Sequence, residues 1–176
     1  MAQGSRIYHG RMALSDVDGD RYLQLEASTA LHPSESIDRL VLRLLAWLLL
    51  HEEGMTFRGG GVSQGDEPDL AVREADGRLL HWIDVGTPSA TRLEKAARTA
   101  RVSVVTHEAL LPRWKRQHGG HLPEFGGRIL VLETGLVTAL AEALPRRFRW
   151  QATITGGTLY LDDGNLSLAG RLYELP

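Results

Sequence analysis

Two aspartates near the middle of the chain have the spacing of a divalent-metal site. Strand-like runs lie on either side of Asp76-Gly77, which is the strongest short signal for a β-hairpin turn. If these two residues form the whole turn, the numbers of cross-strand partners sum to 153. Asp69 then lies opposite Asp84. Because side chains alternate between the faces of a strand, both carboxylates point to the same side.

A bound cation would explain why two acids share this position. Like charges directly opposite each other destabilise a strand pair, whereas hard cations such as magnesium bind carboxylate oxygens together with water and phosphate. Glu67 lies on the same face as Asp69 and offers a third oxygen ligand. We therefore expect Mg²⁺ or Mn²⁺ at Asp69, Asp84 and Glu67. A solvated sheet edge, or ion pairs with Arg73 and Arg78, would explain the same residues without a metal.

Basic residues follow closely on the second strand. Residues 88–100 have the pattern of a helix that begins after Thr87 as its cap, and its polar face carries Arg92, Lys95 and Thr99. Lys95 would orient an attacking water or stabilise developing negative charge, and Arg92 would support the phosphate. A solvated basic face is the alternative interpretation.

A fourth carboxylate lies at the start of the most apolar helix of the chain. Residues 34–51 have apolar residues at helical spacing, and Glu35 at the start of this helix could join the acidic site. Arg39 follows four residues later, so a simple salt bridge explains Glu35 as well.

The elements that must position these residues form an α/β order. Residues 6–14 and 21–30 predict a first hairpin, followed by the helix over 34–51 and a short strand over 55–58. The central hairpin, the helix over 88–100 and a strand over 101–106 come next. The remainder predicts a helix over 108–117, a strand over 128–133, a helix over 136–144 and strands separated by turns over 148–175.

Composition sets the broad class of the protein. A chain of 176 residues, 43% of them hydrophobic, fits one globular domain over residues 1–176. It has no cysteine, which excludes disulfides and thiolate metal sites. Residues 1–10 contain no apolar run and no segment is long enough to cross a bilayer, so we expect a cytoplasmic protein without a membrane partner.

Charge is unevenly distributed along the chain. Residues 91–149 hold 11 Lys and Arg against 5 Asp and Glu, although the net charge of the chain is −2. Nucleic acid is therefore a possible partner. Trp114 and Phe148 each lie among arginines, as in nucleic-acid contacts, but solvated faces explain both clusters equally well. His118-Gly119-Gly120-His121 lacks the spacing of a zinc motif, and we expect no zinc there.

Several longer motifs resemble the YaeQ family. They are Gly65-Asp66-Glu67-Pro68-Asp69-Leu70, His81-Trp82-Ile83-Asp84-Val85-Gly86, His32-Pro33-Ser34-Glu35 leading into Leu42-Arg43-Leu44-Leu45-Ala46-Trp47, and Trp150-Gln151-Ala152-Thr153-Ile154. The resemblance covers nearly the whole chain, and these motifs are specific in combination.

The resemblance implies a fold and a set of site residues. The family is similar to the PD-(D/E)XK superfamily, which implies a restriction-endonuclease-like αβββαβ core, here with an N-terminal β-hairpin and a C-terminal β-meander. Asp69 and Asp84 would match the two acidic positions, and Glu35 the glutamate of the first helix. Gly86 stands where the superfamily has lysine, and Lys95 on the following helix is its expected counterpart.

Two functions follow as hypotheses. The first is a metal-dependent phosphodiesterase (nuclease) acting on nucleic acid through the catalytic residues Asp69, Asp84, Lys95 and Glu35. The second is a non-catalytic binding or regulatory domain that retains the fold, which the missing lysine at Gly86 favours.

Overall fold

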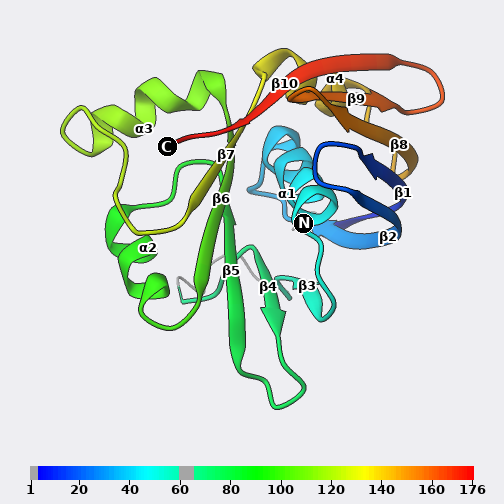
Figure 1. Cartoon of the computed structure of the whole chain (residues 1–176). Coiled ribbons are helices and arrows are strands. Elements are labelled where there is room, and N and C mark those ends of the chain that lie inside the picture. Colours follow the sequence, from blue (N-terminus) through cyan, green and yellow to red (C-terminus); the bar gives the residue numbers. More distant parts are fainter. Residues whose placement is uncertain (1–3, 60–65) are drawn as a thin grey trace.

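The computed structural model describes residues 4–59 and 66–176 of the chain. This part contains ten strands and four α-helices, whose arrangement is drawn in Figure 1. In chain order these are β1 (Arg6–Asp16), β2 (Arg21–Leu31), α1 (Ile37–Leu49), β3 (Met55–Phe57), β4 (Leu70–Arg73), β5 (Leu79–Val85), α2 (Ala90–Ala97), β6 (Arg101–His107), the 3-10 turn η1 (Glu108–Leu110), α3 (Leu111–Gln117), β7 (Arg128–Leu132), α4 (Thr134–Ala143), β8 (Arg147–Thr155), β9 (Thr158–Asp162) and β10 (Ser167–Glu174).

All ten strands belong to one mixed sheet. Its strand order is β2-β1-β8-β9-β10-β7-β6-β5-β4-β3, and it curls around α1 into a nearly closed barrel (Figure 1). Strand β10 connects the two halves, since its first part pairs with β9 and its last three residues pair with β7. Strand β1 pairs in parallel with β8, which follows it by more than a hundred residues.

The predicted fold class is therefore wrong. The order of elements from α1 to β6 agrees with αβββαβ, but these elements do not form a compact restriction-endonuclease-like core with the hairpin and meander attached to it. The N-terminal hairpin β1–β2 and the C-terminal strands β8–β10 continue the same sheet. The pairing of β1 with β8 leaves no local signal in the sequence, because strand alternation reports a buried face and not the neighbouring strand.

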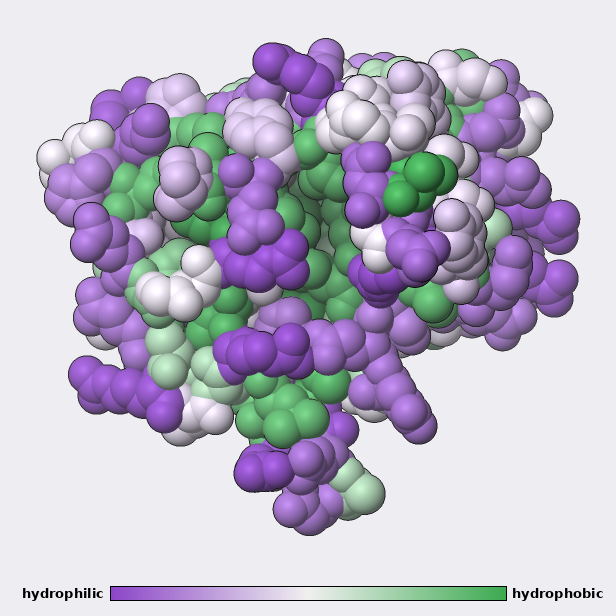
Figure 2. Space-filling model, viewed as in Figure 1, coloured by the Kyte–Doolittle hydropathy of each residue, from purple (hydrophilic) through white to green (hydrophobic). Residues whose placement is uncertain are grey.

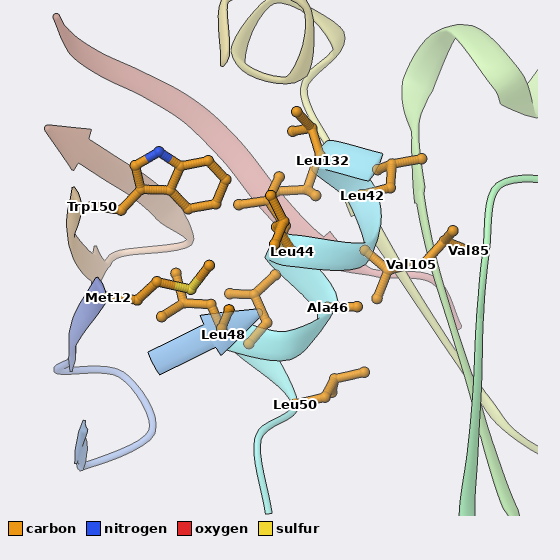
Figure 3. Packing of buried hydrophobic residues seen from close by; sticks show 14 of the residues in the cluster. Met12, Leu42, Leu44, Ala46, Leu48, Leu50, Val85, Val105, Leu132 and Trp150 are labelled. Atoms are coloured by element: carbon orange, nitrogen blue, oxygen red, sulfur yellow. The ribbon is translucent and has the colours of Figure 1, made fainter. Parts of the chain in front are cut away.

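Helix α1 fills the interior of the barrel. Nine of its 13 residues are buried, and they surround the helix instead of forming a single stripe. Figure 3 shows Leu44 and Leu48 packed toward Met12 and Trp150 on one side, with Val85 and Val105 on the other. A helix that is apolar on all sides is typical of a core position. The helix thus joins the two halves of the sheet.

The opposite face of the β5–β7 half packs against α2 and α3. A second hydrophobic cluster there consists of Trp82, Leu93, Ala96, Val102, Val104, Trp114, Ile129 and Val131. The face of the molecule seen in Figure 2 is mostly polar, with hydrophobic residues gathered in a hollow near its centre. None of the helices in the described ranges has the length and apolar character needed to cross a bilayer.

Candidate metal and phosphate site

The two aspartates lie side by side at the junction of β4 and β5. Leu70 pairs with Ile83, so the partner numbers sum to 153 at this point, as predicted. Asp69 and Asp84 are 2% and 1% exposed, and both line one pocket of about 530 Å³. The two carboxylates therefore face the same space, which is the geometric requirement for a shared ligand.

The register agrees for a reason that the sequence did not predict. The turn is not a two-residue turn, because the backbone N–H of Glu74 donates to the carbonyl of Arg78 and leaves three residues in the loop. Arg73 accordingly pairs with Leu79, which shifts the register by one, and a bulge between Val72 and Arg73 restores it. Two irregularities compensate each other before the strands reach the aspartates.

Backbone hydrogen bonds interlock the two carboxylates. The N–H of Asp69 donates to Oδ1 of Asp84 at 3.3 Å, and the N–H of Val85 donates to Oδ2 of Asp69 at 2.9 Å. Each carboxylate thus accepts a bond from the strand that carries the other. This arrangement fixes the orientation of both side chains.

Each aspartate is also paired with an arginine. Nη2 of Arg39 contacts both carboxylate oxygens of Asp69 at 2.7 and 2.8 Å. Nε and Nη2 of Arg92 contact Asp84 at 2.7 and 3.0 Å in a two-point pair. Burial lowers the pKa of each arginine, but the neighbouring aspartate outweighs this effect and the net pKa is raised. Both guanidinium groups therefore remain charged.

Trp82 completes the surroundings of Asp84. Its Nε1 donates to Oδ2 of Asp84 at 2.8 Å, and the guanidinium of Arg92 lies over its ring at 4.8 Å from the centroid. An arginine on an aromatic face is attracted by the ring electrons in addition to the carboxylate. Trp82 thus holds both members of the buried pair in place.

Helix α2 brings Arg92 to the pocket. The helix begins after Ser89, whose side chain accepts a hydrogen bond from the N–H of Arg92; Thr87, the predicted cap, lies two residues earlier. Leu93 and Ala96 bury the apolar face of the helix against the sheet. This orientation directs Arg92 toward Asp84.

The structure does not bring Lys95 to the aspartates. Its Nζ pairs with Asp66 at 2.8 Å, and both side chains are largely exposed. Gly86, where the resemblance led us to look for a lysine, has φ +82°, a conformation that disfavours any residue with a side chain. Arg92 is the cation of α2 that reaches the carboxylates, and the charged fork that it offers is suited to phosphate as well as to carboxylate.

Glu35 is connected to the pair through arginines. It accepts hydrogen bonds from Arg43 at 2.7 and 2.8 Å, and the predicted contact with Arg39 is present at 3.3 Å. Glu35, Arg39 and Asp69 line a second pocket of about 350 Å³, which adjoins the first and shares Arg39, Arg58 and Asp69 with it. The glutamate therefore supports Arg39 and faces the same depression as Asp69.

The remaining candidates take other positions. The backbone carbonyl of Glu67 accepts a hydrogen bond from Arg92, whereas its half-buried side chain lines neither pocket. The predicted alternative of ion pairs with Arg73 and Arg78 is not observed. Arg73 donates to the carbonyl of Gly77, and Arg78 pairs with Glu74.

Two sequence motifs have structural roles. Nδ1–H of His118 donates to the carbonyl of Trp114, and Nε2 of the same ring accepts from the N–H of Ala90, so His118 joins α3 to α2. Trp114 and Phe148 are 0% and 8% exposed and do not present rings for stacking. The glycine-rich segment 59–65 lies, beyond Gly59, outside the described residues.

Sequence reasoning missed the arginine partners of the aspartates. It gave Arg39 only a salt bridge with Glu35 and considered Arg92 only as a phosphate contact. The contact between Arg39 and Asp69 spans 30 residues and depends on how α1 lies in the barrel. One signal was present: Arg43 interrupts an otherwise apolar helix, and a buried arginine requires acidic or carbonyl partners nearby.

The oxygen ligands at this site suit a divalent cation in part. Two buried carboxylates facing one open pocket match the one or two carboxylates with which proteins usually hold magnesium, the other positions being water and phosphate oxygens. Over residues 4–59 and 66–176, no group of three or more potential ligands gathers. Asp69 and Asp84 fit a cation only if Arg39 or Arg92 gives up part of its present contact.

Comparisons with known proteins match this chain to the same family over nearly its whole length. The family model described as YaeQ protein matches residues 1–171. A relative from Salmonella typhi, "Uncharacterized protein YaeQ", is 32% identical over 96% of this chain and 94% of its own length. The protein of the same description from Escherichia coli (strain K12) is 29% identical over the same shares.

Two crystal structures share the fold. The YaeQ protein from Pseudomonas syringae superimposes with a TM-score of 0.86 at 32% identity, over 99% of this chain and 98% of the other. The YaeQ protein from Xanthomonas axonopodis pv. citri also gives a TM-score of 0.86, at 27% identity over 97% and 98% of the two chains.

Proposed function

This chain belongs to the YaeQ family, and we propose that it is a metal-dependent phosphodiesterase acting on nucleic acid. The observation that carries the proposal is the pair of buried carboxylates, Asp69 and Asp84, facing a single pocket rimmed by arginines. Placing two like charges side by side is costly, and clusters of this kind occur preferentially at functional sites.

The proposal uses the resemblance to the PD-(D/E)XK pattern for the site residues alone and not for the fold. Asp69, directly before β4, and Asp84, on the antiparallel strand β5, would occupy the two acidic positions of that pattern, within the barrel-like sheet described above. Arg92 would provide the positive charge that the pattern assigns to lysine. Lys95, one turn further along α2, lies at the outer edge of the site with Asp66.

Each residue has a definable task in this function. Asp69 and Asp84 would hold Mg²⁺ or Mn²⁺, which would supply Lewis-acid polarisation of the phosphate and a water of lowered pKa. Arg39 and Arg92 would turn from the carboxylates toward the phosphate, because guanidinium binds either anion with two parallel hydrogen bonds. Glu35 would keep Arg39 at the rim through its own hydrogen bond.

Metal binding and cleavage test the proposal together. Mg²⁺ or Mn²⁺ should raise the melting temperature of the parent by mass action, and Asp69→Asn or Asp84→Asn should abolish the increase. Asp66→Asn is the matched control, since it removes the same charge from an exposed residue near the site and should leave the metal effect intact. The parent should cleave nucleic acid in millimolar Mn²⁺. The proposal would be contradicted if the metal did not stabilise the parent and the parent cleaved no single-stranded, duplex or structured substrate.

A specific observation favours a second candidate, a non-catalytic nucleic-acid-binding domain. The protein alone already satisfies the carboxylates: Asp84 accepts hydrogen bonds from Arg92, Trp82 and the N–H of Asp69, and Asp69 accepts from Arg39 and the N–H of Val85. In this function the aspartates would only position arginines for phosphate. Salt-sensitive binding that is indifferent to metal, without cleavage, would support it.

A further inference from the structure

A row of basic side chains lies on the outer surface of the barrel. His9 and Arg11 on β1 are the cross-strand partners of Arg147 and Arg149 on β8. All four side chains are exposed, and the alternate residues Met12, Phe148 and Trp150 point into the core. Gly10 shows how closely the inner side is packed, because a Cβ there would lie 2.1 Å from the ring of Phe148.

These charges are only partly neutralised within the sheet. Arg11 and Arg149 are direct neighbours on adjacent strands, an arrangement that costs stability for like charges. Arg11 has one acidic neighbour, Glu26, at 3.5 Å, and both side chains are more than two-thirds exposed. In the described part of the chain, Arg147 and Arg149 have no ion-pair partner. An anion bound along β8 would relieve this repulsion.

Aromatic rings lie on the same face of the sheet. Tyr160 on β9 is 47% exposed and pairs with Thr153 of β8. Thr153 follows Arg149 by four residues and therefore lies on the same face of the strand. Tyr22 on β2 pairs with Ser15 of β1 and is 62% exposed. Exposed aromatic rings beside a basic row are the two components with which proteins bind single strands, through base stacking and phosphate contacts.

A series of depressions with shared lining residues lies between the basic row and the aspartate site. A depression of about 380 Å³ lined by Arg146, Arg147 and Ser5 lies at its end. Ser5 also lines the 350 Å³ pocket, and that pocket shares Arg39 with the pocket of Asp69 and Asp84. Each depression thus shares a lining residue with the next, and arginines line all three; we refer to the basic row and these depressions together as the path.

We propose that this path binds single-stranded nucleic acid, with the sugar–phosphate backbone along Arg147 and Arg149 and bases stacking on the exposed tyrosines. The inference rests on the proposed function for the phosphodiester at Asp69 and Asp84, and it specifies the substrate as a single strand. A duplex would offer its phosphates to the arginines but would keep its base faces away from Tyr22 and Tyr160.

Binding without metal tests the path separately from cleavage. The affinity of a fluorescein-labelled single-stranded DNA oligonucleotide is measured by fluorescence anisotropy in EDTA for the parent and for Arg147→Gln/Arg149→Gln. We expect binding by the double variant to be weaker by about tenfold or more, and the slope of log K against log salt to fall by about 1.4, that is, about 0.7 for each lost phosphate contact. Tyr160→Ala should weaken binding and leave the salt slope unchanged.

The matched control is Arg113→Gln/Arg116→Gln on α3. Both residues are exposed and their replacement removes the same charge from a surface away from the path. We expect less than about a twofold effect, since only a general charge effect remains. Melting curves will show whether each variant is folded.

Binding and cleavage can fail independently, so the single-strand path and the phosphodiesterase proposal are tested separately. Equal losses in the β8 and α3 variants, equally tight binding of duplex, or no binding by the folded parent would overturn the path. Cleavage by the parent with unchanged binding by the β8 variant would overturn the path and leave the phosphodiesterase proposal standing. Binding that depends on Arg147 and Arg149, without cleavage under any metal, would support the path and contradict the phosphodiesterase.

Discussion

Replacing Arg92 by alanine should destabilise the protein, because it leaves a buried carboxylate without its ion-pair partner. The substitution leaves Asp84, which is 1% exposed, without the guanidinium that contacts both of its carboxylate oxygens. Breaking a buried ion pair by removing one partner typically costs about 3–5 kcal/mol. The side chain of Arg92 is 21% exposed and borders an open pocket, so water would partly solvate the aspartate. We therefore expect a loss near the lower end, about 3 kcal/mol.

Urea denaturation of four proteins measures this effect. The parent, Arg92→Ala, Asp84→Asn and the double variant form a thermodynamic cycle, and an unchanged m-value would show that only stability differs. Arg92→Ala should cost at least about 1 kcal/mol less in the Asp84→Asn background, since no buried charge is then left alone. Lys95→Ala, on the same helix but with an exposed partner, is the control and should change stability little.

The same variant connects stability to metal binding. Without Arg92, the oxygens of Asp84 are open to a cation, so Mn²⁺ should stabilise Arg92→Ala more than the parent. A loss below about 1 kcal/mol, or an additive cycle, would refute the conclusion that Arg92 neutralises a buried charge.

Three further predictions concern the elements that support the site. Burial lowers the pKa of His81, so on acidification the unfolded chain binds a proton more readily than the folded protein does. As the pH is lowered from about 6.5, the free energy of unfolding should therefore decrease, by at most about 1.4 kcal/mol per pH unit. His81→Asn should reduce this slope in denaturation series at successive pH values. Ser89→Ala should cost about 1 kcal/mol by removing the cap of α2, and a Ser89→Asp variant that retains the parent stability would confirm that the loss is one of capping. Gly54→Ala should lower the melting temperature more than Gly77→Ala, because both glycines have positive φ but only at Gly54 would the new Cβ meet backbone, 2.6 Å from the carbonyl oxygen of Arg73; equal losses would contradict this.

Local features of the fold were accessible from the sequence. The hairpin strands, the helix over α1 and the facing positions of Asp69 and Asp84 follow from side-chain periodicity, which each segment carries within itself. The turn was predicted incorrectly, since a three-residue loop and a bulge together produce the same register as the two-residue turn that was expected.

Long-range features were not accessible. The parallel pairing of β1 with β8 and the crossing of β10 between two neighbours determine the barrel, and neither depends on a local pattern. The partner of Asp69 is Arg39, which lies 30 residues earlier and reaches the site only because α1 occupies the barrel interior. The cap of α2 at Ser89 turns Arg92 toward Asp84, a difference of two residues that sequence patterns do not resolve.

The most direct test of metal binding by Asp69 and Asp84 is a crystal structure of the protein soaked in millimolar Mn²⁺ and recorded at a wavelength where manganese scatters anomalously. We expect an anomalous peak between Asp69 and Asp84, with metal–oxygen distances of about 2.2 Å and with Arg39 or Arg92 turned away from its carboxylate. Carboxylates still held by both arginines, with no peak between them, would contradict it.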